Sequence, residues 1–128
     1  MINVVAAIIE NQKGQVLIAK RKKGELAGYW EFPGGKIERG ETPEQSLIRE
    51  LNEEMNLEIE IGEYVGESVY LYDKRAIRLL AYRGKITRGN IKLTDHEEYA
   101  WINLHNFKKV KLAPADIPFI EMMGKNFK

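Results

Sequence analysis

The sequence predicts an α/β fold, in which a mixed β-sheet packs in layers against two or three helices. Three observations carry this prediction: a β-branched, almost wholly apolar segment near the N-terminus, a capped amphipathic helix in the middle of the chain, and alternating apolar segments after it. A chain of 128 residues is long enough to bury a hydrophobic core, and we expect one domain over residues 1–128.

The composition is typical of a globular protein and excludes several functional classes. Hydrophobic residues make up 44% and charged residues 30% of the chain, and the formal net charge of +1 lacks the basic excess of a general nucleic-acid binder. The absence of cysteine excludes a disulfide framework and a zinc site with thiolate ligands. No apolar run approaches the ~18 residues of a membrane span, and the N-terminus lacks the basic segment of a signal peptide. We therefore expect a cytoplasmic monomer or homodimer that binds neither membranes nor nucleic acid.

The N-terminal quarter of the chain predicts two strands. Residues 3–10 (NVVAAIIE) are typical of a buried strand, and residues 15–21 (QVLIAKR) form a second one after a turn at 11–14. We expect the two strands to form a hairpin. The basic cluster at 20–23 is either a solvated strand end or a phosphate contact, since Arg binds phosphate with two parallel hydrogen bonds.

A helix is predicted from Pro43 to about Met55. Thr42 is a suitable N-cap, Pro43 fits the first helical position, and Gln45 stands where a capping-box partner belongs. Its apolar side chains recur at spacings of three and four, at Leu47, Ile48, Leu51 and Met55. Asn56 suits the helix end, because Asn tolerates the left-handed conformation better than most residues.

The second half of the chain predicts further strands and a last helix. The expected strands lie at residues 58–72, 76–82 and 99–104, and a turn-rich connection is expected at 84–94. A helical turn is expected at 105–109 and a helix at 117–123, which Asp116 can cap from the loop at 112–116.

Acidic residues concentrate on and around the central helix. Residues 36–58 contain seven acidic and three basic residues. Glu50, Glu53 and Glu54 share one helix face, where like charges repel by a few tenths of a kcal/mol per pair. Arg49 lies within this group and can pair with Glu41 or Glu53, which would balance the charge and orient a carboxylate. The alternative is an ordinary solvated charge run.

A glycine turn beside this face favours a cation site. The carbonyl groups of Gly34 and Gly35 are accessible to a ligand because glycine lets the backbone approach closely. Hard cations such as Mg²⁺ and Mn²⁺ choose carboxylate, carbonyl and water oxygens. The chain has no Cys and no His pair four residues apart, so zinc is not expected. Carboxylate-bound Mg²⁺ usually serves phosphate chemistry.

These residues resemble the Nudix family. The family motif is G-x5-E-x7-R-E-U-x-E-E-x-G-U, where U is a bulky aliphatic residue, and the segment from Gly35 to Leu57 matches eight of its nine defined positions. The exception is Asn56, where the family usually has Gly. The sequences WEFPGGK at 30–36 and LAPAD at 112–116, with the preceding Lys20-Arg21, are similar to the MutT and CTP-pyrophosphohydrolase branch.

The resemblance implies an α/β/α sandwich and Mg²⁺-dependent hydrolysis of a nucleoside triphosphate to the monophosphate and pyrophosphate, with Mn²⁺ able to replace Mg²⁺. It implies metal ligands at Glu50, Glu53, Glu54 and the Gly34 carbonyl, and a catalytic role for Arg49. A further acid is implied at Asp95, with Glu97 and Glu98 as competing candidates. Either Glu53 or Asp95 is the candidate for orienting or deprotonating the attacking water. The implied substrate contacts are Arg21, Phe32, Gly35, Lys36 and Asp116.

Asp116 is the candidate base-reading residue. An ionised Asp only accepts hydrogen bonds, so it matches the amino group of cytosine or the N1–H and 2-amino groups of guanine and 8-oxoguanine. The alternative is a plain helix cap, and the two roles are compatible. Phe32 or Tyr29 can stack on a base, or belong to the core.

Several functions remain open from the sequence. The first is a housecleaning enzyme for oxidised or modified dNTPs such as 8-oxo-dGTP, and the second is a (d)CTP-directed pyrophosphohydrolase. The third is a catalytically silent nucleotide sensor, which the complete set of helix glutamates disfavours. Hydrolysis of ADP-ribose or a dinucleotide is a fourth, since the motif concerns only the diphosphate.

Overall fold

The computed structural model of the protein describes residues 1–126. Its elements are β1 (Ile2–Ile9), β2 (Val16–Arg21), β3 (Trp30–Glu31), β4 (Gly34–Lys36), α1 (Pro43–Met55), β5 (Glu58–Tyr72), β6 (Arg75–Arg88), β7 (His96–Ile102), the 3-10 helix η1 (Leu104–Lys109) and α2 (Ile117–Asn126). One sheet has the order β4-β1-β6-β5 and the other β3-β2-β7. Strand β1 is parallel to β6 and antiparallel to β4, so the sheet is mixed as predicted.

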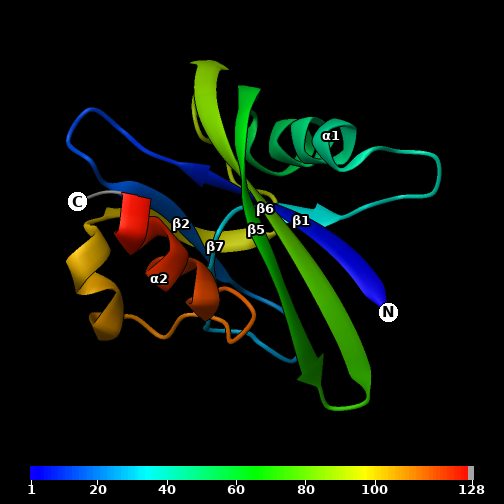
Figure 1. The fold of residues 1–128 in the computed structure, drawn as a ribbon. Helices are drawn as coiled ribbons and strands as arrows, with labels where there is room; N and C mark the ends of the chain where they lie inside the picture. Colours follow the sequence, from blue (N-terminus) through cyan, green and yellow to red (C-terminus); the bar gives the residue numbers. More distant parts are fainter. Residues whose placement is uncertain (127–128) are drawn as a thin grey trace.

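Helices α1 and α2 lie on opposite sides of the strands (Figure 1). Alternate residues of β1 and β2 therefore face two different cores. Ala6, Ile8, Val16 and Ile18 pack with Phe119 and Met123 of α2. Val5, Ala7, Ile9, Leu17 and Ala19 pack with Leu47, Leu51 and Met55 of α1. This double burial explains why both strands are continuously apolar, and it confirms the predicted layered α/β fold.

Helix α1 begins and ends where the sequence predicted. The Thr42 hydroxyl accepts the Gln45 N–H at 3.1 Å, and the Gln45 side chain accepts the Thr42 N–H at 2.9 Å, which completes the capping box. Asn56 follows the helix in the left-handed conformation, with φ 59° and ψ 34°. The expected helical turn near 105–109 and the last helix are also present.

The predicted hairpin between β1 and β2 is wrong. The two strands belong to different sheets and share a single bridge, between Glu10 and Val16. The turn between them closes on itself instead, through the Asn11 N–H to Gln15 carbonyl bond at 2.9 Å. A strand buried on both faces fills its hydrogen-bonding edges inside a sheet, and β1 does so with β4 and β6, which lie far away in the sequence.

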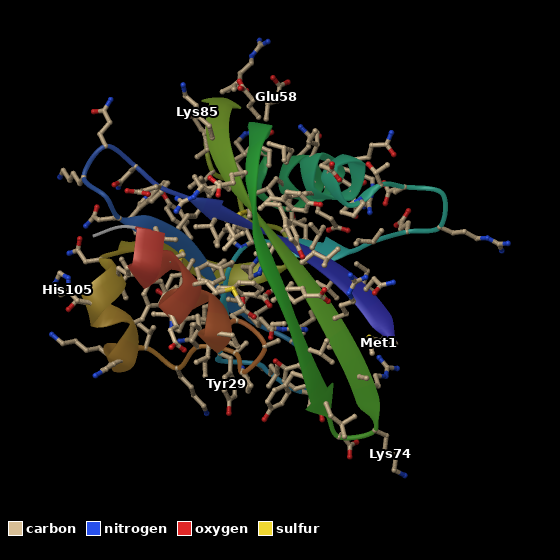
Figure 2. All side chains as sticks on the ribbon, viewed as in Figure 1. Met1, Tyr29, Glu58, Lys74, Lys85 and His105 are labelled. Atoms are coloured by element: carbon tan, nitrogen blue, oxygen red, sulfur yellow. The ribbon has the colours of Figure 1, made fainter. Side chains whose placement is uncertain are left out.

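The longest hairpin joins β5 and β6, and Lys74 marks its tip while Glu58 and Lys85 mark the opposite end (Figure 2). The turn-rich connection expected at 84–94 is partly wrong, because β6 continues to Arg88 and only the following residues are irregular. No helix within residues 1–126 is both long and apolar enough to cross a membrane.

Candidate active site

A cavity of about 700 Å³ opens between the two sheets, helix α1 and the loop before α2. All three segments that the sequence singled out contribute to its wall: the glycine turn, the acidic helix and the 112–116 loop. The predicted site residues that line it are Arg21, Phe32, Gly34, Gly35, Lys36, Glu50, Glu54, Asp95 and Asp116. Phe32 and Asp116, which are 84 positions apart in the chain, thus line the same cavity.

The glycine turn expected from the sequence is wrong, because Gly34 and Gly35 form strand β4 beside β1 and neither has a positive φ. This strand lies against the acidic helix. Gly34 pairs with Ala6 of β1, and a Cβ at position 34 would collide with the Val5 carbonyl. A Cβ at Gly35 would collide with the carboxylate of Glu50. Both glycines are therefore required by close approach, and the second brings the backbone against a candidate metal ligand.

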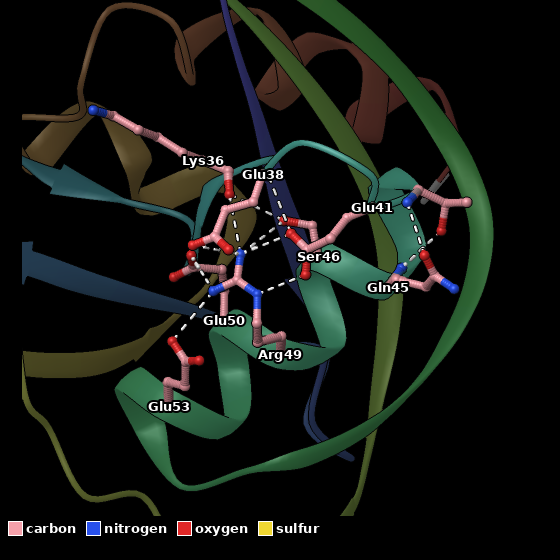
Figure 3. A network of polar contacts seen from close by, with 9 residues as sticks. Lys36, Glu38, Glu41, Gln45, Ser46, Arg49, Glu50 and Glu53 are labelled. Carbon is pink, nitrogen blue, oxygen red and sulfur yellow. Dashed lines mark hydrogen bonds and ion pairs between the residues drawn. The ribbon is translucent and has the colours of Figure 1, made fainter.

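Arg49 organises the acidic residues (Figure 3). Its Nε and Nη2 atoms donate to the two carboxylate oxygens of Glu41 at 2.7 and 2.9 Å, and Nη1 donates to Glu50 at 3.0 Å and to Glu53 at 3.2 Å. The hydrogen bonds from Arg49 hold the pKa of Glu41 down at about 2. The pKa of Arg49 is raised in return, chiefly by Glu41 and then by Glu50. Both ion pairs expected for Arg49 are thus present.

Glu54 extends toward Asp95 on the neighbouring loop. Burial raises the pKa of Glu54, and the carboxylates of Glu50 and Asp95 raise it further. Glu97 and Glu98, the competing candidates, instead face Lys20 at 3.7 and 3.5 Å. The structure therefore brings Asp95, rather than Glu97 or Glu98, to the acidic helix.

As the side chains stand, no three acidic or histidine side chains within residues 1–126 are arranged to hold a metal ion. Arg49 accounts for this at two of the helix glutamates, because its guanidinium binds Glu50 and Glu53 together. Direct ligation by the whole set would require these side chains to rearrange.

The far end of the cavity is closed by Asp116, which is 5% exposed. Its Oδ2 atom accepts the Phe32 N–H at 2.9 Å. Its backbone carbonyl, rather than its side chain, accepts the Phe119 N–H in the first turn of α2. The Asp116 side chain is thus fixed by the segment that leads into β4.

The surroundings of Asp116 favour the neutral form of its carboxyl group. Burial raises the pKa of Asp116 well above its usual value, and the negative charge of Glu31 adds to the effect, while the Phe32 N–H and Arg21 oppose it. A neutral carboxyl group can donate one hydrogen bond as well as accept. The acceptor-only argument from the sequence therefore applies only to the ionised form.

Three residues that sequence reasoning missed also line the cavity. Glu31 lies between Arg21 (3.5 Å, Nη1 to Oε1) and the buried His96 (2.9 Å, Nε2 to Oε2). Because a carboxylate accepts, the Nε2 atom of His96 is assigned as the donor, and its Nδ1 atom has no protein partner. The available signals were the 30–36 segment, which contains Glu31, and Asp95, which directly precedes His96.

Tyr72 is the third missed residue. Its hydroxyl accepts the Ala115 N–H at 2.7 Å, and its ring lines the cavity. The ring of Phe32 is buried against Phe107, with centroids 6.0 Å apart, which agrees with the core alternative. The Tyr29 ring carries the ammonium group of Lys111 at 4.2 Å. Phe32 is thus a core residue with 2% exposure, and Tyr29 is not among the residues that line the cavity.

This combination of fold and site is that of a known family. The family model of the NUDIX domain matches residues 2–123. The chain belongs to the Nudix family. Membership confirms the expectation of a Nudix-type diphosphatase fold and motif, and Nudix hydrolases generally use a divalent metal ion.

Known Nudix proteins resemble the chain over most of its length. It is 41% identical over 122 residues to the CTP pyrophosphohydrolase of Escherichia coli, covering 94% of this chain and 90% of that protein. It is 39% identical over 114 residues to a putative 8-oxo-dGTP diphosphatase 2 of Mycobacterium tuberculosis, covering 86% and 79%. The crystal structure of the MutT protein from Methanosarcina mazei superimposes with a TM-score of 0.89 at 27% identity, covering 99% and 96%.

The cavity residues suit a divalent metal ion. Glu50, Glu54 and Asp95 line the same cavity, and burial followed by the charges of Glu50 and Asp95 raises the pKa of Glu54. A divalent cation would offset that repulsion, and oxygen donors on a rigid helix are what hard cations prefer. Gly35 permits the backbone to approach the carboxylate of Glu50.

Proposed function

We propose that this Nudix protein is a Mg²⁺-dependent nucleoside triphosphate pyrophosphohydrolase of the cytoplasm, which converts a triphosphate and water to the monophosphate and pyrophosphate. Its preferred substrates are oxidised or modified dNTPs such as 8-oxo-dGTP. One observation carries the proposal: a single cavity joins the acidic edge of α1 at one end to the buried Asp116 at the other.

The acidic end is the proposed metal end. Glu50, Glu53, Glu54, Asp95 and the Gly34 carbonyl are the proposed donors to Mg²⁺, which Mn²⁺ can replace. The bound cation neutralises phosphate charge and makes a nearby water more acidic. Positioning and electrostatics supply most of the rate in such a site.

Arg49 has a positioning role in this proposal. Its two bonds to Glu41 anchor the guanidinium beside the helix N-terminus, and its bonds to Glu50 and Glu53 hold these two carboxylates together. The Glu53 side chain is 58% exposed, so water reaches it even while it is paired with Arg49. Glu53 and Asp95 are the two proposed proton acceptors.

Arg21 and Lys36 are the proposed contacts for the substrate's triphosphate, since both basic side chains belong to residues that line the cavity. Arg21 is held by Glu31 at 3.5 Å, which directs a planar guanidinium toward the cavity. Asp116 then meets the base edge.

A panel of pyrophosphate-release assays tests the proposal: 8-oxo-dGTP, dGTP, CTP, dCTP, 5-methyl-dCTP and ADP-ribose, each with Mg²⁺ and with chelator. We expect a modified dNTP to be hydrolysed with the highest kcat/KM of all substrates in the panel. No release from any triphosphate would favour the nucleotide-sensor alternative. Repeating the panel with Asp116→Ala tests base reading, because unchanged relative rates would reduce Asp116 to a structural residue.

A (d)CTP-directed activity is the second candidate. It is favoured by the 41% identity to the CTP pyrophosphohydrolase of Escherichia coli over 94% of this chain. The Asp116 carboxyl group has an oxygen that can accept from the amino group of cytosine in either protonation state. The same panel separates the candidates, since this function predicts that CTP or dCTP is hydrolysed with a higher kcat/KM than 8-oxo-dGTP.

A further inference from the structure

The loop at residues 89–95 forms the C-terminal cap of the acidic helix. The last four carbonyls of an α-helix have no partner within the helix. In α1 three of these carbonyls accept hydrogen bonds from the loop. The Thr94 hydroxyl donates to the Glu53 carbonyl at 3.0 Å, the Thr94 N–H to the Glu54 carbonyl at 3.1 Å, and the Lys92 N–H to the Met55 carbonyl at 3.0 Å. The fourth carbonyl, that of Asn52, accepts the Asn56 N–H at 3.1 Å.

Asn56 adds a bond in the opposite direction. Its side-chain amide donates to the Asn90 carbonyl at 3.0 Å, so the helix end also holds the loop. Gly89 lies so close to the Asn56 carbonyl that a Cβ at position 89 would collide with it. Ile91 and Leu93 then pack on the α1 side of the core. The loop is therefore fixed to the helix at several points before it reaches Asp95.

The bond from Asn56 depends on the one position where this chain departs from the Nudix motif. A glycine at that position adopts the left-handed conformation at less cost, but it has no side chain to donate. Asn56 adopts this conformation at a modest cost in free energy, and its hydrogen bond to the Asn90 carbonyl offsets that cost. The substitution is thus linked by a direct contact to the loop that carries Asp95.

We propose that Asn56 and Thr94 are positioning residues, which clamp the 89–95 loop onto the end of α1 and so hold Asp95 beside Glu54 before any metal binds. The inference rests on the proposed function insofar as Asp95 serves the metal. The clamp itself concerns only the metal-free protein.

The decisive variant is Asn56→Gly, which restores the usual family residue and removes only the side-chain bond. Amide hydrogen exchange at Lys92 and Thr94 is measured in the metal-free protein, and Mn²⁺ affinity is measured by titration without nucleotide, with free Mn²⁺ followed by paramagnetic resonance. The exchange rate of both amides is expected to rise about two- to fivefold, which corresponds to the loss of one net hydrogen bond. The Mn²⁺ dissociation constant should rise by a similar factor.

Two comparisons separate the clamp from general destabilisation. Thr94→Val should also speed amide exchange and weaken Mn²⁺ binding. Thr94→Ser keeps the hydroxyl and should have wild-type values for both. Asn52→Ala is the matched control, since Asn52 is an exposed Asn on the same helix and only its backbone takes part in the cap. It should change neither readout.

Unchanged exchange in Asn56→Gly would overturn the clamp. Faster exchange with unchanged Mn²⁺ affinity would overturn the positioning of Asp95. Wild-type protein that binds Mn²⁺ but releases no pyrophosphate from any triphosphate would overturn the proposed function alone, and the two failures are thereby distinguished.

Discussion

The hydroxyl of Tyr72 accepts a hydrogen bond from the Ala115 N–H at 2.7 Å, which joins the β5–β6 hairpin to the loop that carries Asp116. The same loop is tied to β3 by the Trp30 N–H to the Lys111 carbonyl and by the Ala113 N–H to the Trp30 carbonyl, both at 2.8 Å. Asp116 is therefore held by contacts from two separate strands.

Tyr72→Phe is expected to weaken this attachment. It leaves the Ala115 N–H without its partner, which should lower the free energy of unfolding by about 1 kcal/mol. The KM for the best nucleotide should rise several-fold, with a smaller change in kcat, because the base end moves and the metal end does not. Urea denaturation and steady-state kinetics measure the two effects.

Tyr70→Phe is the control for this prediction. The Tyr70 ring lies 4.7 Å from that of Tyr72 and is 42% exposed. Its unfolding free energy should change by less than about 0.5 kcal/mol. If both variants had the same KM, the Tyr72 hydroxyl would have no role in placing the base loop.

Glu53→Gln is expected to leave the fold intact and to remove most metal-dependent turnover. Glu53 contributes one exposed ion pair, which is worth little to stability, but it is a proposed ligand and proton acceptor. A loss of about 100-fold or more in kcat is expected for such a role. Pyrophosphate release at saturating Mg²⁺ measures it, with circular dichroism as the check on folding.

Glu60→Gln provides the comparison, since Glu60 is an exposed glutamate on β5 outside the cavity. It should retain wild-type kcat. Normal turnover by Glu53→Gln would show that the acidic face of α1 is an ordinary charged surface.

Glu41 should make stability depend on acid pH. Its hydrogen bonds with Arg49 lower the pKa of Glu41 from 4.5 to about 2. A carboxyl group with a depressed folded-state pKa stabilises the protein above the unfolded pKa, and this contribution is lost as the pH falls. The gap in unfolding free energy between wild type and Glu41→Gln should therefore be widest above pH 4.5 and should close toward pH 2.

Urea titrations of the metal-free proteins between pH 2 and 6 measure this gap. Glu60→Gln serves again as the control, because it removes an exposed carboxylate on β5. A gap between wild type and Glu41→Gln that stayed constant over this range would contradict the assignment of the shifted pKa to Glu41.

Asp116 predicts the opposite pH dependence. Burial, with the charge of Glu31, raises the pKa of Asp116 above the unfolded value of 3.8. The folded state then holds a proton that the unfolded state has lost, so this group makes the protein less stable as the pH rises above 3.8. Asp116→Asn keeps an acceptor for the Phe32 N–H but does not titrate, and its stability relative to wild type should increase between pH 4 and 7.

Asp73→Asn is the matched control, because Asp73 lies in the exposed hairpin turn with φ 49°, a conformation that Asn also tolerates. Its stability relative to wild type should not vary with pH in the same way. A flat difference for Asp116→Asn would mean that Asp116 is ionised in the folded protein throughout this range.

The sequence was most informative where structure is local. Thr42, Pro43 and Gln45 define the start of α1 through contacts within four residues, and the helix spacing places Glu50, Glu53 and Glu54 on one edge. Strand pairing was less predictable, because β1 meets β6 about 75 residues later, and nothing near β1 encodes that partner. The hairpin prediction failed for this reason.

The site shows the same division. Asp95 could not be separated from Glu97 and Glu98 by sequence, since the choice depends on how Thr94 caps α1 and how Lys20 draws the other two away. His96 was missed because it begins β7, which pairs with the distant β2. Tyr72 was missed because it ends β5, whose hairpin partner β6 is positioned by pairing with the distant β1. Local motifs identified the chemistry, and long-range packing completed the cavity.

The alternation along β1 has a consequence for substitutions in this strand. Val4 and Ala6 line the cavity and belong to the core that α2 covers, while Ala7 and Ile9 pack beneath α1. Neighbouring residues of β1 therefore belong to different cores. A substitution at Val4 or Ala6 would therefore alter the cavity wall through the core that α2 covers. A substitution at Ala7 or Ile9 would instead act on the core beneath the helix that carries Glu50, Glu53 and Glu54.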